Sequence, residues 1–375
     1  MEIIKKVKVT HGEPLKGRVV KVTSKVENFE TPDKVPTSTE INAKNEIGFD
    51  EPWFNPVFEV GNRFNKLENI QRLHRKNGAF GDKKREIIAH VERFKGYALT
   101  KYHPQISHGT PLSERDIRTF IDLQIESGLD IITILEPTPL NDVVLFEKNF
   151  NKFWEYTTNI NPNLVVMPYI TLKQENELFE KKLEILSQYE HSLKTIGIRF
   201  ASMVEYRPNL LSLSEFGEND FWIHCSGGRK MPHWQTPNAQ LHALQRFGVD
   251  TFSIEIPQGG KGSSNSYRKV NFFDPNTITF PKIGKIAQND KLSCDCPICS
   301  QQNLSDVVSD LKEYNPKRET KLMVNDFAKV HEVFASSNEL EVSREKIKED
   351  LLVDYFNEKP GLKSYSHIGR QQKLF

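Results

Sequence analysis

Residues 113–136, SERDIRTFIDLQIESGLDIITILE, carry the clearest secondary-structure signals in the sequence. Ser113 and Asp116 predict a capping box at the start of a helix. Apolar residues then recur at helical spacing as far as Ile125, and Gly128 predicts the end of the helix. Asp130–Glu136 is a short β-branched run of the kind that forms a buried strand. This stretch therefore predicts one complete helix-and-strand unit.

The same unit recurs along the chain. Thr236-Pro237 predicts a helix that ends at Gly248, and residues 251–256 follow as a strand. Further strands are predicted at residues 98–100, 164–171, 195–200 and 221–224. Strands that alternate with amphipathic helices indicate a parallel sheet covered by helices. An open doubly wound sheet is the alternative, but no glycine-rich turn follows an early strand. We therefore predict an α/β fold, a TIM (β/α)8 barrel with an N-terminal β segment, over residues 1–290.

Composition excludes several classes of protein. The chain has 375 residues, a formal net charge of +1 and 37% hydrophobic residues, which excludes a largely disordered chain and a histone-like binder. No apolar run reaches the roughly 18 residues that span a bilayer, and the N-terminal residues lack the apolar stretch of a signal peptide. Three of the four cysteines fall within six residues, which favours a metal site over disulfides. A cytoplasmic protein without a membrane partner is expected.

The character of the sequence changes after Pro281. A cysteine cluster is followed by two predicted helices, one near residues 323–334 and one near residues 347–355 that ends at Pro360-Gly361. We expect a zinc-binding helical subdomain over residues 291–361 and a basic tail over residues 362–375.

The cysteine cluster has the spacing of a metal site. Cys294, Cys296 and Cys299 form C-x-C-x-x-C, and three thiolates favour zinc or an iron–sulfur cluster. His331 is preferred as the fourth ligand, because imidazole is the commoner partner of three thiolates, and Asp326 is the alternative. Four protein ligands would make the zinc structural. The competing interpretation is three buried thiols beside a core histidine.

Several segments, in order, resemble the tRNA-guanine transglycosylase superfamily, which includes the DNA-guanine transglycosylases of 7-deazapurine DNA modification. The segments are residues 29–36, 128–136, 248–257 and the cysteine cluster. The resemblance implies a TIM barrel with a zinc-binding insertion. It also implies exchange of a guanine in nucleic acid for a free 7-deazaguanine base, with one aspartate as nucleophile and another as acid/base.

Both catalytic aspartate positions of this family are occupied by other residues. Ser253 stands at the nucleophile position and Lys101 at the acid/base position. Glu255 is the candidate replacement nucleophile, because strand alternation places it on the same face as Ser253, about 7 Å further along. A rim carboxylate paired with Lys261 or Lys101 is the alternative. Glu136 is at the position that reads the guanine edge; otherwise it caps a helix.

Other candidate binding residues lie in loops. Gly227 and Gly228 would admit a base close to the backbone and Arg229 would hold a phosphate, unless they form an ordinary tight turn. In the loop after the Ser253 strand, Lys261, Arg268 and Lys269 would contact nucleic acid. N-terminal cations including Arg18, and the tail with Tyr365 and Phe375, would extend that surface; solvated charge is the alternative.

Two functions follow from the resemblance. The first is base exchange, on DNA in preference to tRNA because no RNA-binding domain follows the cysteine region, with nucleic acid and free 7-deazaguanine as partners. The second is a non-catalytic nucleic-acid-binding subunit that pairs with a catalytic paralogue; a homodimer or heterodimer is expected. A barrel hydrolase acting on a small molecule is a third possibility, because periodicity alone does not fix the chemistry.

Overall fold

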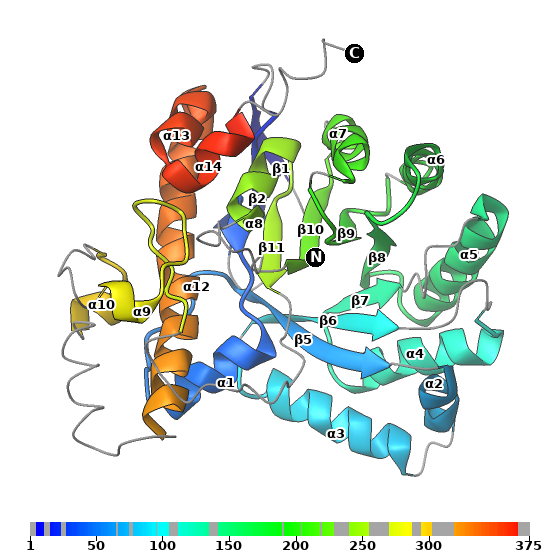
Figure 1. Cartoon of the computed structure of the whole chain (residues 1–375). Helices are drawn as coiled ribbons and strands as arrows, with labels where there is room; N and C mark the ends of the chain where they lie inside the picture. Colours follow the sequence, from blue (N-terminus) through cyan, green and yellow to red (C-terminus); the bar gives the residue numbers. More distant parts are fainter. Residues whose placement is uncertain are drawn as a thin grey trace.

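The chain folds as a TIM barrel with a C-terminal helical region (Figure 1). The computed structural model describes residues 5–10, 16–23, 28–64, 67–74, 78–94, 96–104, 112–134, 142–189, 191–203, 205–217, 220–228, 240–254, 270–286, 294–301 and 319–366. Eight parallel strands are hydrogen-bonded in the order β4-β11-β10-β9-β8-β7-β6-β5. They are β4 (Asp33–Lys34), β5 (Val57–Phe64), β6 (Tyr97–Pro104), β7 (Ile131–Ile134), β8 (Val165–Thr171), β9 (Thr195–Arg199), β10 (Trp222–Gly228) and β11 (Thr251–Ile254).

The two outer strands of this order meet each other. The backbone N–H of Glu59 on β5 donates to the carbonyl of Pro36, just beyond β4, at 2.9 Å, and Thr37 forms a parallel bridge with Glu59. The sheet therefore curls until its first and last strands are in contact, and the predicted barrel is confirmed.

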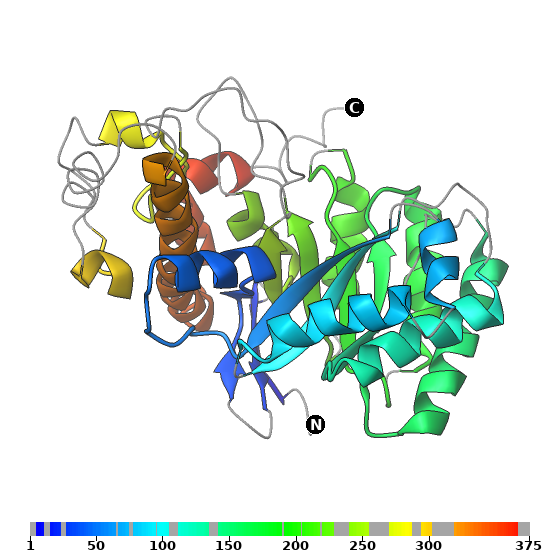
Figure 2. The same ribbon diagram turned by 90° about the horizontal axis from the view of Figure 1, so that it is seen from below.

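Helices cover the outside of the curled sheet (Figures 1 and 2). They are α1 (Ser38–Glu46), α2 (Leu67–Leu73), α3 (Ala79–Val91), α4 (Glu114–Glu126), α5 (Val143–Ile160), α6 (Asn176–Ser187), α7 (Arg207–Phe216), α8 (Gln240–Ala243) and the 3-10 helix η1 (Leu244–Phe247). The capping box of α4 forms as predicted: the N–H of Asp116 donates to Ser113 Oγ at 3.2 Å, and the N–H of Ser113 donates to Asp116 Oδ2 at 2.8 Å. Gly128 ends the turn after α4 with a φ of 74°, in the left-handed region that favours glycine.

A small antiparallel sheet closes the amino-terminal end of the barrel (Figure 2). It consists of β1 (Lys5–Val9), β2 (Arg18–Val22) and β3 (Phe29–Glu30). Val20, Val22 and Phe29 share one hydrophobic cluster with Trp222, and the rings of Phe29 and Trp222 lie edge to face with centroids 6.1 Å apart. These strands therefore lie at the end of the barrel opposite the carboxyl ends of its strands.

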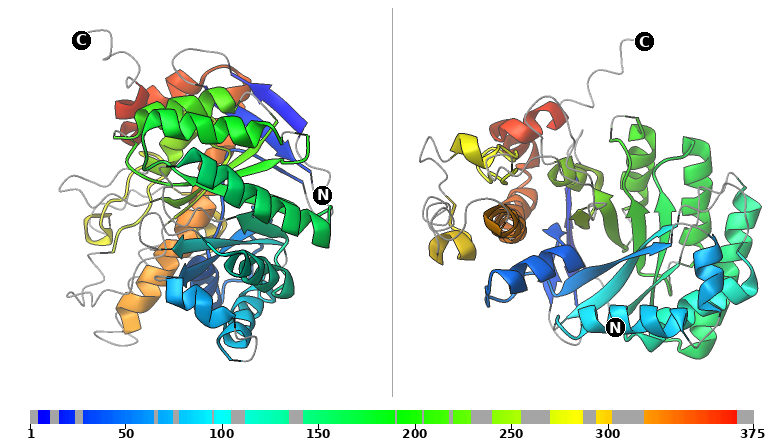
Figure 3. Two further views of the ribbon diagram at one scale, coloured as in Figure 1. Left: turned by 90° about the vertical axis from the view of Figure 1, so that its right-hand side faces the viewer. Right: turned by 60° about the horizontal axis from the view of Figure 1, so that its bottom comes forward.

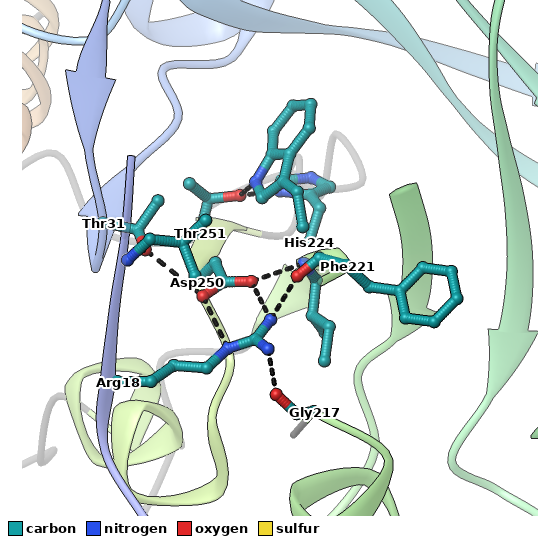
Figure 4. A network of polar contacts seen from close by, with 10 residues as sticks. Arg18, Thr31, Gly217, Phe221, His224, Asp250 and Thr251 are labelled. Carbon is teal, nitrogen blue, oxygen red and sulfur yellow. Dashed lines mark hydrogen bonds and ion pairs between the residues drawn. The ribbon is translucent and has the colours of Figure 1, made fainter. Parts of the chain in front are cut away.

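Arg18 corrects one expectation. Its side chain is buried and its Nε donates to Asp250 Oδ1 at 2.9 Å, while its terminal nitrogens donate to Asp250 and to the carbonyls of Gly217 and Phe221 (Figure 4). The prediction that Arg18 belongs to a phosphate-binding surface is wrong, because its donors are used inside the protein.

The C-terminal region packs on the barrel. Its helices are α9 (Ile283–Ile286), α10 (Pro297–Gln301), α12 (Glu319–Lys348), α13 (Leu352–Glu358) and α14 (Pro360–Ser366). The long helix α12 runs along the barrel beside α1 and β4 (Figures 1 and 3). Lys34 of β4 forms buried ion pairs with Glu40 at 2.9 Å and with Glu332 of α12 at 3.0 Å. Among the described residues, no helix has the length and apolar character needed to cross a membrane.

One predicted helix boundary in this region is wrong and another is right. The first helix continues through Ile347 to Lys348. The helix α13 ends at Glu358, just before Pro360 as predicted, and a further helix, α14, begins at Pro360. Proline is tolerated in the first turn of a helix, where its missing N–H has no intrahelical partner to lose. Leu362 and Tyr365 are buried in α14, so these residues of the expected tail belong to the core.

Candidate active site and candidate metal centre

Ser253, at the predicted nucleophile position, lies inside the barrel. It is fully buried on β11, and its hydroxyl donates to Glu59 Oε2 on β5 at 2.8 Å. The two residues are 194 positions apart in the chain, and the curl of the sheet brings them together. A buried carboxylate therefore lies beside the Ser253 hydroxyl.

His224 on β10 binds the same carboxylate oxygen. Its Nε2 lies 3.0 Å from Glu59 Oε2, and its Nδ1 lies 2.9 Å from the Thr251 hydroxyl (Figure 4). The indole N–H of Trp222 donates to that hydroxyl at 2.8 Å. The Thr251 hydroxyl is thus hydrogen-bonded to both the indole and Nδ1, and the other imidazole nitrogen lies against Glu59. An imidazole proton on Nε2 would be directed at the carboxylate.

Tyr169 on β8 forms a further wall of this interior. Its ring lies over Gly197, where a Cβ would be 2.6 Å from the ring, and its edge faces the His224 ring at a centroid distance of 6.5 Å. Burial, together with the charge of Glu59, raises the pKa of Tyr169 well above its usual range. The phenol is therefore neutral next to the carboxylate.

The chemistry available to this cluster is proton transfer. A serine hydroxyl becomes a useful nucleophile when an adjacent base takes its proton, and Glu59 lies within the distance that such a transfer needs. We call Glu59, His224, Thr251 and Ser253 the barrel network. Sequence reasoning missed Glu59; the available signal was a single carboxylate inside the apolar run Val57-Phe58-Glu59-Val60.

The two predicted base-binding glycines have structural roles. Gly227 has a φ of 81°, which favours glycine, and Gly228 leaves room for the side chain of Leu241, since a Cβ there would lie 1.9 Å from it. The remaining predicted site residues lie outside the described part of the chain: Glu136, Arg229, Glu255, Lys261, Arg268 and Lys269. Lys101 lies on β6, where its backbone pairs with Gly61.

The predicted metal ligands come together. One ligand atom from each of Cys294, Cys296, Cys299 and His331 lies within 4.8 Å of all the others. His331 Nδ1 lies 3.2 Å from Cys299 Sγ and 3.4 Å from Cys296 Sγ. A tetrahedral zinc bound to sulfur and nitrogen would place these atoms about 3.6 Å apart. This cluster could therefore hold a metal ion.

The surroundings of His331 prepare it as a ligand. Its Nε2 donates to the carbonyl of Phe273 at 2.8 Å, which leaves the lone pair of Nδ1 facing the thiols, and Phe272 stacks on the ring at 3.9 Å. Burial lowers the pKa of His331, which favours the neutral form that binds metals. Asp326, the alternative ligand, instead pairs with Lys329 at 2.6 Å. His331 is therefore the fourth member of the cluster.

The thiols also fit a cation. Hydrogen bonds from the other two thiols lower the pKa of Cys294, whereas hydrogen bonds with Cys294 raise the pKa of Cys296 and Cys299. Three thiolates so close together repel each other, and a divalent cation between them removes that repulsion.

Comparisons with known proteins add little to this description. No protein-family model and no curated protein matches the sequence. A tryptophan synthase complex from Pyrococcus furiosus is 10% identical over 60% of this chain and 88% of that chain, with a TM-score of 0.38. A GH26 β-mannanase from Bacteroides ovatus is 10% identical over 60% of this chain and 80% of that chain, with a TM-score of 0.40. Similarities this weak say nothing about the chemistry of the site.

Proposed function

We propose that this protein is a guanine transglycosylase-like enzyme that exchanges guanine in nucleic acid, DNA in preference to tRNA, for a free 7-deazaguanine base. The observation that supports it most directly is the hydrogen bond from Ser253 to Glu59 at 2.8 Å. The residue at the family's nucleophile position thereby has a base in contact with it. The Cys3His cluster beside a TIM barrel is the second support.

The proposed reaction has two symmetrical halves. Ser253 Oγ attacks C1′ of the nucleoside, the bond from C1′ to N9 of guanine breaks, and the hydroxyl proton passes to Glu59. The departing guanine keeps the electron pair of the broken bond and takes up a proton from water, which leaves hydroxide. In the second half, the 7-deazaguanine base gives its N9 proton to hydroxide and attacks C1′, the bond to Oγ breaks, and Glu59 returns its proton to Ser253.

His224 has a positioning role in this reaction. Its Nε2 holds Glu59 Oε2 at 3.0 Å, and Thr251 and Trp222 hold the imidazole in turn. Because the imidazole donates to the carboxylate, it stabilises the ionised form that accepts the serine proton. Glu255, the replacement nucleophile predicted from the sequence, is the competing carboxylate.

The alternative function is a non-catalytic nucleic-acid-binding subunit that partners a catalytic paralogue. One observation favours it: the side chains of Ser253 and Glu59 are both fully buried. A substrate would have to enter the barrel to reach them, whereas a binding subunit has no such requirement.

We further propose that the metal is structural zinc. Four protein ligands would close its coordination shell, and the ion would join Cys294, Cys296 and Cys299 around α10 to His331 in α12. Elemental analysis of the purified protein should give one zinc per chain, and Cys296→Ser should abolish it. Retention of zinc in that variant, or iron with the visible absorption of an iron–sulfur cluster, would refute the assignment.

The activity is tested with labelled guanine, supplied to zinc-loaded protein in parallel with duplex DNA and bulk tRNA. We expect label in DNA, and a loss of at least about 100-fold in Ser253→Ala and Glu59→Gln. Glu177→Gln is the matched control, because this carboxylate is exposed on α6 and pairs only with Lys181 in the described structure. Loss of activity in Glu255→Gln but not in Glu59→Gln would transfer the role to Glu255. Label in neither polymer, with folded and zinc-loaded protein, would favour the binding subunit.

A further inference from the structure

Arg246, on the outer helical layer, has a buried side chain in which two guanidinium nitrogens lack a hydrogen-bond partner among the described residues. The residue is 2% exposed and lies in η1, and its Nε and Nη1 have no hydrogen-bond partner. Within the described structure Arg246 forms no ion pair. Its Cζ lies over the ring of Phe247, 4.9 Å from the ring centroid. Buried donors of a charged group are almost always satisfied in proteins, so this group requires an explanation.

A second arginine lies near it. Arg207 is the first residue of α7, which packs against η1, and its Nε is also buried without a partner. Burial and the nearby charge of Arg207 lower the pKa of Arg246 to about 10. Arg207 is half-buried, so part of this residue is exposed to the solvent.

Arg18 shows that this chain can satisfy a buried guanidinium when the group is structural. Arg18 is 3% exposed, and all three of its nitrogens donate to Asp250 or to backbone carbonyls. The side chain of Arg246 is at least as buried. Among the described residues, no carboxylate and no carbonyl oxygen accepts a hydrogen bond from its Nε or Nη1. Arg246 and Arg207 therefore supply unused hydrogen-bond donors and positive charge. These are the features of a binding site whose hydrogen-bond acceptor belongs to another molecule.

We propose that Arg246 and Arg207 form a binding site for a phosphate-type oxoanion. A phosphate oxygen pair matches the planar donor edge of a guanidinium, and a doubly charged anion balances two arginines. The site lies between α7 and η1, on the outside of the barrel, so it is separate from the barrel network and goes beyond the proposed base exchange. The anion is either free phosphate, including small phosphate esters, or a phosphate of bound nucleic acid.

The test is the thermal unfolding of the purified protein in inorganic phosphate, with chloride at equal ionic strength as the reference. A ligand at ten times its Kd should raise the Tm of a chain of this size by about 2 °C. Arg246→Met should abolish this rise without lowering the Tm in chloride, because the variant removes an unpaired buried charge. Arg246→Lys and Arg207→Met should each weaken the response, and Arg207→Met leaves the buried position intact if Arg246→Met fails to fold.

The matched control is Arg85→Met, an exposed arginine paired with Asp82, which should keep the full phosphate response. An unchanged response in both Arg246→Met and Arg207→Met, or no response in the wild type, would overturn the proposal. A short single-stranded oligonucleotide distinguishes the sources: competition with phosphate identifies nucleic acid, and additive effects identify free phosphate. Neither result depends on the exchange assay, so failure of the base-exchange proposal would be seen separately.

Discussion

Two buried polar networks adjoin each other at β10 and the start of β11, yet their carboxylates have different kinds of partner. Asp250 binds the guanidinium of Arg18, the hydroxyl of Thr31 and the backbone N–H of Ile223 (Figure 4). Glu59, in the barrel network, binds the hydroxyl of Ser253 and the imidazole of His224. A guanidinium does not release its proton in proteins, whereas a hydroxyl and an imidazole can both exchange one.

Burial alone therefore does not identify a reactive carboxylate. Asp250 links the amino-terminal sheet to the barrel, because Arg18 belongs to β2 and Thr31 follows β3. Thr251, the next residue along the chain, already belongs to the barrel network. We therefore expect substitutions at the amino-terminal end to affect folding and substitutions in the barrel network to affect chemistry.

The largest expected effect is that of Asp250→Asn. The variant leaves the Arg18 charge buried without its counterion, and loss of one partner of a buried ion pair lowers the free energy of unfolding by about 3–5 kcal/mol. Urea denaturation measures it, and the double variant with Arg18→Met should be less destabilised than the single one. If Asp250→Asn lowers the free energy of unfolding by less than about 1 kcal/mol, the Asp250 network is not the one that mainly supports folding, and the distinction between the two networks fails.

The next largest expected effect is the pH dependence of stability that is caused by His242. It is buried in α8 against Phe273 and Ser336, and burial lowers its pKa to about 3. The unfolded chain takes up this proton near pH 6.5 and the folded chain does not until about pH 3, so stability falls as the pH falls between these values. The loss from pH 7 to pH 4 should be about 3 kcal/mol.

The check is His242→Gln, which should flatten the dependence of unfolding free energy on pH over this range. The pH dependence that remains in His242→Gln measures the contribution of the other titratable groups, including those of both networks. An unchanged slope would show that His242 is not the residue that makes the protein acid-sensitive.

Glu59→Gln should lower the free energy of unfolding by about 1–3 kcal/mol, the range for a disturbed buried hydrogen bond. The amide keeps the volume of Glu59 but cannot take the serine proton, so the loss of exchange activity should be far larger than the loss of stability suggests. Urea denaturation and the exchange assay measure the two. A destabilisation equal to that of Asp250→Asn, with activity retained, would make the barrel network purely structural.

Ser253→Ala should have the smallest effect on stability, about 0.5–1.5 kcal/mol, because it removes one hydrogen bond and creates little space. Ser253→Asp is the informative companion, because it places two carboxylates together and should raise the pH at which activity appears. A comparison of Ser253→Ala with Ser253→Asp distinguishes the role of the hydroxyl group from the role of the place that residue 253 occupies in the barrel.

Local features of this chain were predicted correctly. The capping box at Ser113 and the stop at Gly128 depend on residues within a few positions of one another, and both are found. The three cysteines lie on one turn, so their spacing alone indicates a metal cluster, and ligand preference identified His331 across 32 residues. The end of α13 just before Pro360 was also predicted, but the start of α14 at that residue was not, because proline permits a helix start as well as a helix stop.

The sequence alone was sufficient to predict the alternation of helices and strands, and hence a parallel sheet covered by helices, because hydrophobic periodicity and caps are short-range properties. It also determined the cysteine cluster. Two contacts could be seen only in the tertiary structure: the hydrogen bond of Ser253 with Glu59, and that of Arg18 with Asp250, 232 residues away. These pairs depend on which strands become neighbours and in which register, and closing the barrel joins segments from opposite ends of the chain that no local pattern links.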